Sequence, residues 1–260
     1  MHAEIMDVIP LWCFLPILLV VLLLTLELGN RLGRWRHSRA IDEKEAPVAA
    51  MVASVLGLLA FMLAFTFSMA ASRFDARRHA VLQEANAIGT THLRSRLLPE
   101  PERDEMARLL VRYTELRTYK PTPENIGDLL TESEQLHEAM WSKAVEAAEK
   151  NPGAIMTGLF LESLNETIDL HSERVSVGLY SRIPTIIWLM LLGLAVLGMI
   201  SVGYQSGLSM TRRSPEMLLF IFAFSCVLYL IIDLDRAHEG SLQISQRVFI
   251  KLYETMRITE

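Results

Sequence analysis

PVAAMVASVLGLLAFMLAFTFSMAASRFDARR, residues 47–78, begins as an apolar membrane segment and ends as a charged helix. No residue between Glu45 and Arg73 is charged, and charged side chains then arrive together: Arg73, Asp75, Arg77 and Arg78. Neither a proline nor a helix-ending turn separates the apolar part from the charged part. The stretch therefore predicts one long helix that leaves the bilayer and enters an extramembrane helical domain.

The composition agrees with a membrane protein that has a substantial polar portion. Of the 260 residues, 51% are hydrophobic and 21% are charged. The net charge is −5, and the chain contains no basic run of the kind that binds nucleic acid. Cys13 and Cys226 both lie in apolar runs, so the sequence predicts neither a disulfide framework nor a reactive thiol.

Four uncharged windows are candidates for membrane spans, namely residues 8–26, 46–72, 183–211 and 217–232. A span needs roughly 20 apolar residues. The last window has 16 residues, which is about 24 Å of helix, so it can cross only if Asp233 faces protein or the headgroup layer. The first window lacks a basic region before it and a small-residue cleavage site after it, so we expect a retained helix rather than a signal peptide.

Basic residues predict the orientation of these spans. The first short loop contains Arg31, Arg34, Arg36, Arg39 and Lys44, and the third contains Arg212 and Arg213. The N-terminal segment MHAEIMD contains no Lys or Arg. The positive-inside rule then places both short loops in the cytoplasm, and both termini and residues 73–182 outside it. The arginines just after residue 72 favour the opposite orientation.

Residues 73–182 predict four further helices, because apolar residues recur there at helical spacing between breaks at Pro99, Pro121 and Pro152. The last of them is expected to run into the third span, with Pro184 at the entry. The predicted fold class is all-α, an integral membrane protein with four transmembrane helices, the second and third extending into an extramembrane helical bundle. The predicted segments are 1–46 (first span and basic loop), 47–72 (second span), 73–182 (bundle), 183–232 (third and fourth spans) and 233–260 (amphipathic tail).

One face of the second span is a candidate pore lining. Six residues follow a 4-3-4-3-4 spacing and share one stripe, with serines toward the ends and phenylalanines between: Ser54, Leu58, Phe61, Phe65, Ser68 and Ser72. A narrow hydrophobic neck can gate a pore by dewetting. The alternative is ordinary helix–helix packing, in which small residues allow close approach.

The end of the fourth span, IIDLDRAHEGSLQISQ, is a second candidate site. Asp233, Asp235 and Arg236 crowd the membrane border, and they are expected to emerge on the same side as Arg73, Arg77 and Arg78. A charge network at a pore vestibule would follow, with Asp75 nearby and Arg–carboxylate pairs as its strongest contacts. The alternative is an interfacial anchor.

A metal site would need several polar residues of the bundle to converge: Glu84, His79, His92, Asn165, Asp169 and His171. Asp169 and His171 are two residues apart and point in different directions on a helix. Buried polar contacts are therefore expected instead, with no metal and no cofactor. The chain has no Gly-rich phosphate loop and no nucleophile–base pair, so an enzyme is not expected.

Several ordered blocks resemble the bacterial bestrophin-like integral membrane family. They are AFTFSMAASRFDARR (64–78), EANAIGTTHLRSRLLPEP (84–101), LNETIDLHSERV (164–175), RIPTIIWLML (182–191) and LIIDLDRAHEGSLQISQ (230–246). Bestrophins are pentameric ligand-gated anion channels with four spans per subunit, and bulky apolar residues of the second span form their pore neck. The resemblance implies this role for Phe61 and Phe65. The acidic calcium clasp of bestrophins is not recognisable here, and bestrophins keep their extramembrane portion in the cytoplasm.

Two functions follow from these observations. The first is a homo-oligomeric ion channel, a pentamer by resemblance, with its pore lined by the second span. The second is a non-conducting, membrane-anchored helical sensor or scaffold. The expected partners are the lipid bilayer, further copies of the chain and, for a channel, ions; nucleic acid is not expected. The expected location is a bacterial inner membrane, with the bundle in the periplasm.

Overall fold

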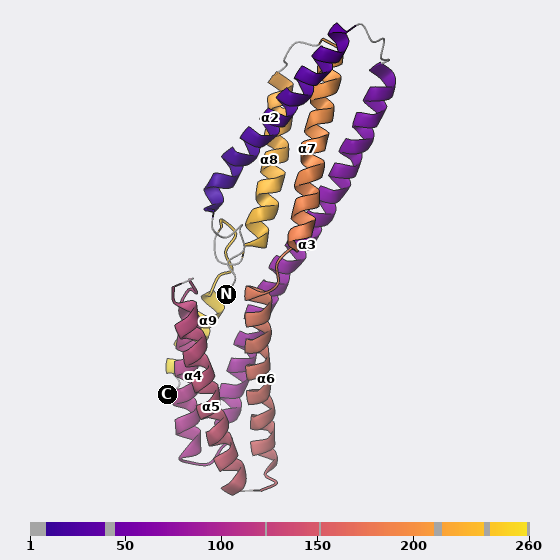
Figure 1. The fold of residues 1–260 in the computed structure, drawn as a ribbon. Coiled ribbons are helices and arrows are strands. Elements are labelled where there is room, and N and C mark those ends of the chain that lie inside the picture. The colour runs from indigo at the N-terminus through magenta and orange to yellow at the C-terminus, as the bar shows by residue number, and fades with distance from the viewer. Residues whose placement is uncertain are drawn as a thin grey trace. The chain divides into compact units, whose positions relative to one another are not determined.

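A computed structural model describes residues 9–39, 45–122, 124–150, 152–210, 215–236 and 240–258 (Figure 1). These ranges are almost entirely helical and contain no strand, which confirms the predicted all-α fold class. The chain divides into two compact units. The membrane unit comprises Met1–Arg73 and Arg182–Leu242, and the bundle unit comprises Phe74–Ser181 and Gln243–Glu260. Parts of the orientation argument lie outside the described residues, namely the segment MHAEIMD, Lys44, Arg212 and Arg213.

Among the residues that the structure describes, four helices are long and apolar enough to cross a membrane, and they correspond to the four uncharged windows: α2 (Leu11–Ser38), α3 (Glu45–Ser95), α7 (Thr185–Leu208) and α8 (Pro215–Asp235). Helix α8 has 21 residues, because it continues beyond the uncharged window through Asp233. The side chain of Asp233 is only 2% exposed. It therefore faces protein, as the short apolar window requires.

The basic residues Arg31, Arg34 and Arg36 were expected in a loop, but they belong to α2, which continues to Ser38. No proline interrupts the helix in this part. Arg31 also forms an ion pair with Glu27, one turn earlier, with 3.0 Å between Nε and Oε1. Such a pair one turn apart favours the helical conformation.

Close packing of α2 against α7 depends on two pairs of glycines. Gly29 and Gly33 of α2 meet Gly203 and Gly207 of α7, so each helix contributes a small-x-x-x-small pattern. A Cβ atom on Gly33 would lie 3.0 Å from the Cα atom of Gly207, which leaves no room for a side chain. Within the same contact the buried amide of Asn30 donates a hydrogen bond of 3.4 Å to Ser206.

Helix α3 runs without interruption for 51 residues, as the opening stretch of sequence predicts. The third span, in contrast, does not continue from the last bundle helix as the sequence predicts. Five residues separate the end of helix α6 (Ile155–Leu179) from Thr185, where α7 begins. Proline has no N–H, and it disfavours the helical conformation of the residue before it. Pro184 consequently separates the two helices instead of lying at the entry of a continuous one.

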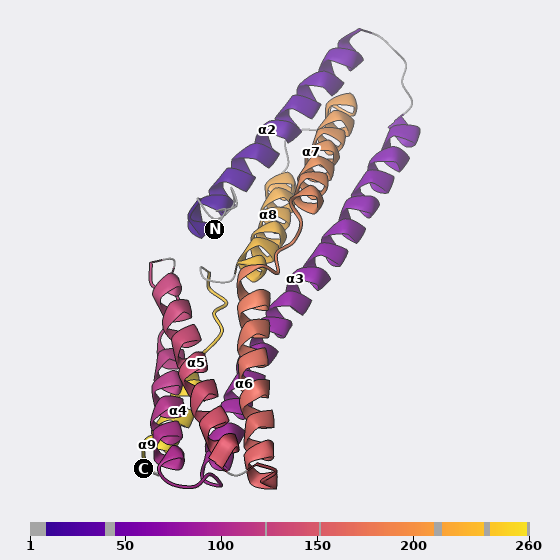
Figure 2. The ribbon, with the colours of Figure 1, turned by 60° about the horizontal axis from the view of Figure 1, so that its bottom comes forward.

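The bundle unit packs residues 74–95 of α3 with α4 (Glu102–Thr118), α5 (Ile126–Lys150), α6 and α9 (Arg247–Ile258), as Figure 2 shows. Its core is formed by large side chains that are fully buried, among them Ile88, Met106, Leu110, Tyr113, Met140, Phe160, Leu164 and Phe249. The helices are separated near Pro99, Pro121 and Pro152, where the sequence predicts breaks.

The C-terminal segment 233–260 was expected as one amphipathic tail, but the structure divides it between the two units. Residues up to Leu242 belong to the membrane unit. Helix α9 packs on α4, and its apolar face buries Phe249 and Met256 in the core of the bundle unit. The amphipathic pattern of α9 therefore reflects packing within the bundle.

The glycine contact between α2 and α7 yields a stability prediction. In Gly203→Ala the new methyl group collides with the backbone at Leu26 and Asn30, so we expect a loss of about 1–3 kcal/mol of stability. Gly193→Ala is the matched control, because a Cβ atom there meets nothing within 4 Å. Thermal unfolding of the detergent-solubilised chain measures both. Equal melting temperatures for the two variants would contradict the proposed packing.

Candidate functional site

The six stripe residues of α3 are all exposed in the described chain: Ser54, Leu58, Phe61, Phe65, Ser68 and Ser72. Phe61 is 63% exposed and Phe65 is 53% exposed. The opposite face of the same helix is buried in the membrane unit through Val52, Leu59 and Leu63. The chain's own helices therefore cover one face of α3 and leave the stripe open.

Two hydroxyl groups of α3 form hydrogen bonds within the helix: that of Ser54, which belongs to the exposed stripe, and that of Thr66, which is buried outside it. Thr66 donates a hydrogen bond of 2.7 Å to the Met62 carbonyl, and Ser54 donates one of 2.9 Å to the Ala50 carbonyl. The stripe therefore presents aromatic and aliphatic surface with hydroxyl groups toward its ends. No residue of the stripe is charged, and the first charged residue of α3 after it is Arg73.

The charged residues at the end of α8 are almost completely buried and bond within the membrane unit. Asp233 accepts a hydrogen bond of 3.0 Å from the backbone N–H of Ser241 and another from its hydroxyl group. Asp235 accepts one of 3.0 Å from the backbone N–H of Ile183, just before α7. These carboxylates join the end of α8 to two neighbouring segments.

Arg236 makes a third connection of this kind. Its Nη2 atom donates a hydrogen bond of 2.6 Å to the Ile9 carbonyl, and its guanidinium carbon lies 5.1 Å from the ring centre of Phe14. Gly240 has a φ of +138°, and a Cβ atom at this position would collide with Oδ1 of Asp233, so glycine allows the carboxylate to approach the backbone here. The predicted pairing of this cluster with Arg73, Arg77 and Arg78 stays a prediction, because Arg77 and Arg78 belong to the bundle unit.

A buried carboxylate, Glu84, is the centre of a polar cluster in the bundle unit. Its side chain is 0% exposed. Tyr113 donates a hydrogen bond of 2.9 Å to its Oε1 atom, and the Nε atom of Arg117 lies 3.1 Å from the same oxygen. The Nε atom of Arg174 contacts the other oxygen, and Nδ1 of His171 lies 3.5 Å from Oε1. Helices α3, α4 and α6 thus converge on one carboxylate.

A second set of contacts surrounds Arg117. Its Nη2 atom lies 2.7 Å from the hydroxyl oxygen of Ser133 on α5 and 3.1 Å from Nδ1 of His171. Its guanidinium group also lies over the ring of Tyr113, 4.4 Å from the centroid. His137 packs beside the rings of Tyr113 and His171, with both pairs of centroids 4.9 Å apart. All four long helices of the bundle therefore contribute to this cluster.

The cluster keeps its carboxylate charged and its histidines neutral. Burial by itself would raise the pKa of Glu84, but Arg174, a hydrogen bond with His171 and Arg117 together lower that pKa to about 2. Burial lowers the pKa of His137 to about 4, with His171 and Arg117 acting in the same direction. Burial likewise lowers the pKa of His171, although Glu84 partly opposes this effect.

The residues considered as metal ligands make contacts within the chain. Glu84 and His171, two of the metal candidates from the sequence, do converge, but two guanidinium groups occupy the carboxylate oxygens. Asn165 and Asp169 contact each other at 3.3 Å on an exposed face. Within the described ranges no group of three or more His, Cys, Asp and Glu residues could hold a metal ion.

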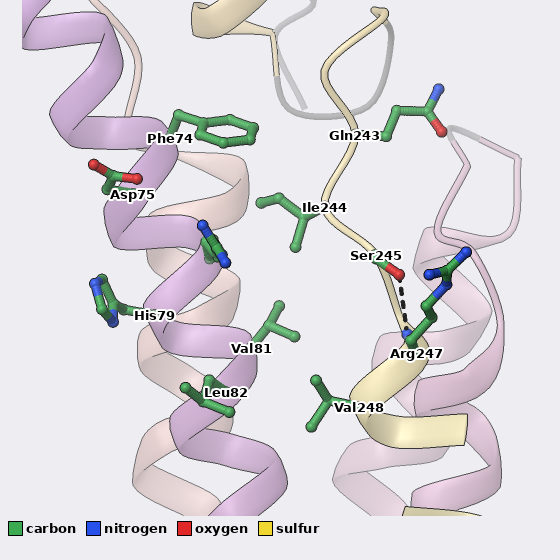
Figure 3. Close-up of a pocket in the computed structure, with 11 residues that line it drawn as sticks. Phe74, Asp75, His79, Val81, Leu82, Gln243, Ile244, Ser245, Arg247 and Val248 are labelled. Atoms are coloured by element: carbon green, nitrogen blue, oxygen red, sulfur yellow. Dashed lines mark hydrogen bonds between the residues drawn. The ribbon is translucent and has the colours of Figure 1, made fainter. Parts of the chain in front are cut away.

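The bundle unit also contains a groove of about 650 Å³ between the first turns of α3 beyond residue 73 and the segment that leads into α9 (Figure 3). Its walls are largely apolar, and they are formed by Phe74, Val81, Leu82, Ile244 and Val248. Sequence reasoning did not identify this groove, because its two walls lie more than 150 residues apart in the chain.

The comparisons with known proteins agree with this architecture. The family model described as the Bestrophin-like domain matches residues 17–249, which is most of the chain. The chain belongs to the bestrophin-like family. The predicted resemblance to this family is therefore confirmed. The comparison with curated proteins gives no match.

Solved structures share the fold. A crystal structure of a variant of a bacterial bestrophin homologue from Klebsiella pneumoniae has a TM-score of 0.66 and 16% identity, covering 92% of this chain and 97% of that one. Another structure of a bacterial bestrophin homologue from the same organism has a TM-score of 0.65 and 17% identity, with coverages of 91% and 96%. The bestrophin-like chain is thus a membrane protein with a bestrophin-type fold.

The Glu84 cluster predicts a strong effect of a single substitution. Glu84→Gln leaves Arg117 and Arg174 without their anionic partner, and removing one member of a buried ion pair costs about 3–5 kcal/mol. Glu162→Gln is the control, because Glu162 is 73% exposed in its pair with Arg94 and such pairs contribute less than about 1 kcal/mol. Denaturant unfolding followed by circular dichroism measures both losses. A loss in Glu84→Gln no larger than the control's would contradict the proposed role of the carboxylate.

A second prediction concerns acid stability. His137 has a pKa of about 4 in the folded chain and an ordinary value of 6.5, so the unfolded state binds its proton at a higher pH. The resulting stabilisation is fully present above pH 6.5 and is lost as the pH falls toward 4. We expect His137→Gln to lose less stability than the wild type over this interval. The exposed His79→Gln is the control and should keep the wild-type slope; an unchanged slope in His137→Gln would refute the assignment.

Proposed function

We propose that this bestrophin-like chain forms a homo-oligomeric ion channel whose pore is lined by the stripe of α3. The observation that carries the proposal is that Phe61 and Phe65 are exposed in the described chain although they lie in the middle of a membrane span. Family membership supports the same function. In an oligomer the stripes of several subunits would face a common axis.

The residue types of the stripe suit a gated pore. Phe61 and Phe65 lie four residues apart, or about 6 Å along the helix. A ring of each would form a short hydrophobic neck, through which water and ions pass only when it is wide enough to stay wet. Ser54 on one side and Ser68 and Ser72 on the other would offer hydroxyl groups to ions at the two ends of the neck.

Self-association is required by this function. Each subunit supplies a single stripe, so several copies around a closed axis are needed to surround a pore. The resemblance to bestrophins favours a pentamer. At the vestibule we place Arg73, Asp75, Arg77 and Arg78, with Asp233, Asp235 and Arg236 in the same charge network.

The proposed location is a bacterial inner membrane, with the bundle unit in the periplasm. Arg31, Arg34 and Arg36 lie in the last turns of α2, where the positive-inside rule predicts the cytoplasmic surface. Bestrophins have the opposite arrangement by resemblance. Cleavage of the bundle unit by protease in intact spheroplasts would support the periplasmic assignment, and protection would overturn it.

Ion flux through liposomes that contain the purified full chain tests the channel. We expect Phe61→Ala combined with Phe65→Ala to raise the flux several-fold, because the neck becomes wider and more easily wetted. Phe67→Ala is the matched control, since Phe67 is a 40% exposed phenylalanine of the same helix outside the stripe. Absence of flux in the wild type, or a chain that stays monomeric, would contradict the channel and favour the scaffold alternative.

A further inference from the structure

The exposed face of α6 is acidic and ends in an aromatic side chain. Six exposed residues follow a 4-3-4-3-4 spacing and therefore share one face of the helix, which we call the α6 stripe: Glu162, Glu166, Asp169, Glu173, Ser176 and Tyr180. Tyr180 is the C-cap and keeps a helical backbone conformation. Within the described ranges, Glu162 pairs with Arg94 and the other three acids form no ion pair. Like charges one turn apart repel each other, so a basic partner would stabilise this stripe.

The exposed face of α9 has the opposite charge. This helix buries Phe249 and Met256 in the bundle. Its outer side, which we call the α9 surface, exposes three basic residues, one acidic residue and two isoleucines: Arg247, Lys251, Arg257, Glu254, Ile250 and Ile258. Figure 3 shows that the side chain of Arg247 points away from α3. The α9 surface therefore combines positive charge with apolar side chains, and in charge it complements the α6 stripe.

The two surfaces lie on different sides of the bundle unit. Helix α9 packs on α4, whereas α6 packs on α5. Figures 1 and 2 both show α6 and α9 apart from each other, with other helices of the bundle between them. The complementary surfaces are thus too far apart to meet within one subunit. A contact between two different surfaces can instead repeat from copy to copy, and it forms a closed ring when the rotation closes.

The α6 stripe and the α9 surface lie at the same height along α3. On one side of α3, the Thr91 hydroxyl group donates a hydrogen bond of 2.8 Å to the Ser163 carbonyl of α6. On another side, a Cβ atom on Gly89 would lie 3.4 Å from Cδ1 of Leu252 in α9. Copies related by rotation about an axis parallel to the bundle would consequently bring the acidic residues of one subunit level with the basic residues of the next.

Tyr180 lies at the height of the groove in the bundle unit. Arg174 of α6 contacts Glu84 of α3, and the two helices run in opposite directions. Tyr180 comes six residues after Arg174, which corresponds to position 78 of α3, six residues before Glu84. The α3 wall of the groove extends over residues 74–82, and the groove has a volume of about 650 Å³. Tyr180 is 74% exposed, and a tyrosine that fills a pocket is a typical anchor of a protein interface.

We propose that the α6 stripe of one subunit docks on the α9 surface of the next subunit. Tyr180 would enter the groove of that neighbour, between its α3 and the segment that leads into α9. Glu166 and Asp169 would approach the neighbour's Lys251. The proposal rests on the proposed function, because a pore lined by α3 needs several copies, and it specifies the two surfaces that join them.

Site-directed cross-linking of the full, detergent-solubilised chain tests this pairing. Asp169→Cys and Lys251→Cys are introduced together into a chain that carries Cys13→Ser and Cys226→Ser, and a short bifunctional maleimide is added. We expect a ladder of covalent multimers, because each subunit offers one cysteine to each neighbour. The two single-cysteine variants should remain uncross-linked, since a residue in a head-to-tail contact does not meet its own copy.

Substitution of Tyr180 tests the anchor. Tyr180→Ala should weaken the association of subunits about 30-fold, equivalent to about 2 kcal/mol. Native mass spectrometry over a dilution series measures this change. Tyr119→Ala is the matched control, because Tyr119 is a 50% exposed tyrosine at the end of α4 and belongs to neither surface. Both side chains are exposed, so the melting temperature of the dissociated subunit should not change in either variant.

Charge reversal tests the electrostatic part of the contact. Lys251→Glu places a negative charge against the acidic stripe, and we expect it to weaken association about 10-fold. Asp169→Lys combined with Lys251→Glu restores opposite charges, and it should recover most of this loss. Glu138→Lys is the control, because Glu138 is exposed on α5 outside both surfaces; its association should equal that of the wild type.

The outcomes separate this interface from the channel itself. Cross-linking of Asp169→Cys alone would show that like surfaces meet, and it would overturn the proposal. An oligomeric chain that gives no cross-link with both cysteines would also overturn it and would leave the channel standing. A monomeric wild type would contradict both. Cross-links between the two surfaces in a chain without ion flux would support the interface and contradict the channel.

Discussion

The unbroken hydrogen bonding of α3 from Glu45 to Ser95 sets the angular positions of the exposed stripe and of Glu84 around that helix. Residues spaced at three and four positions share a face of a helix. One face is covered by the membrane unit through Leu59 and Leu63 and another is left open with Phe61 and Phe65. Further along the same helix, Glu84 is the centre of the polar cluster in the bundle unit. A kink or a shift by one residue would therefore change the open stripe and the buried carboxylate together.

Glu84 gives the bundle a specific arrangement at an energetic cost. A buried carboxylate is unfavourable unless charges and hydrogen bonds compensate for the lost water. Here Arg117, Arg174 and Tyr113 provide that compensation, and each of them reaches the carboxylate only when α4 and α6 are in register with α3. Apolar packing alone tolerates small shifts between helices. The carboxylate therefore restricts the bundle to one register, and burial lowers the pKa of the neighbouring His137 to about 4.

Much of the fold could be predicted from the sequence because its signals are local. Uncharged windows identify spans, and proline positions identify breaks between helices. The Glu84 cluster could not be predicted, because helical periodicity does not distinguish a buried Arg117 from a solvated one, and because the two arginines that pair with Glu84 lie 33 and 90 residues from it in the chain. The pattern of α9 was visible, but its partner α4 was not. The glycines of α2 and α7 form two recognisable motifs, yet only the structure shows that they meet each other.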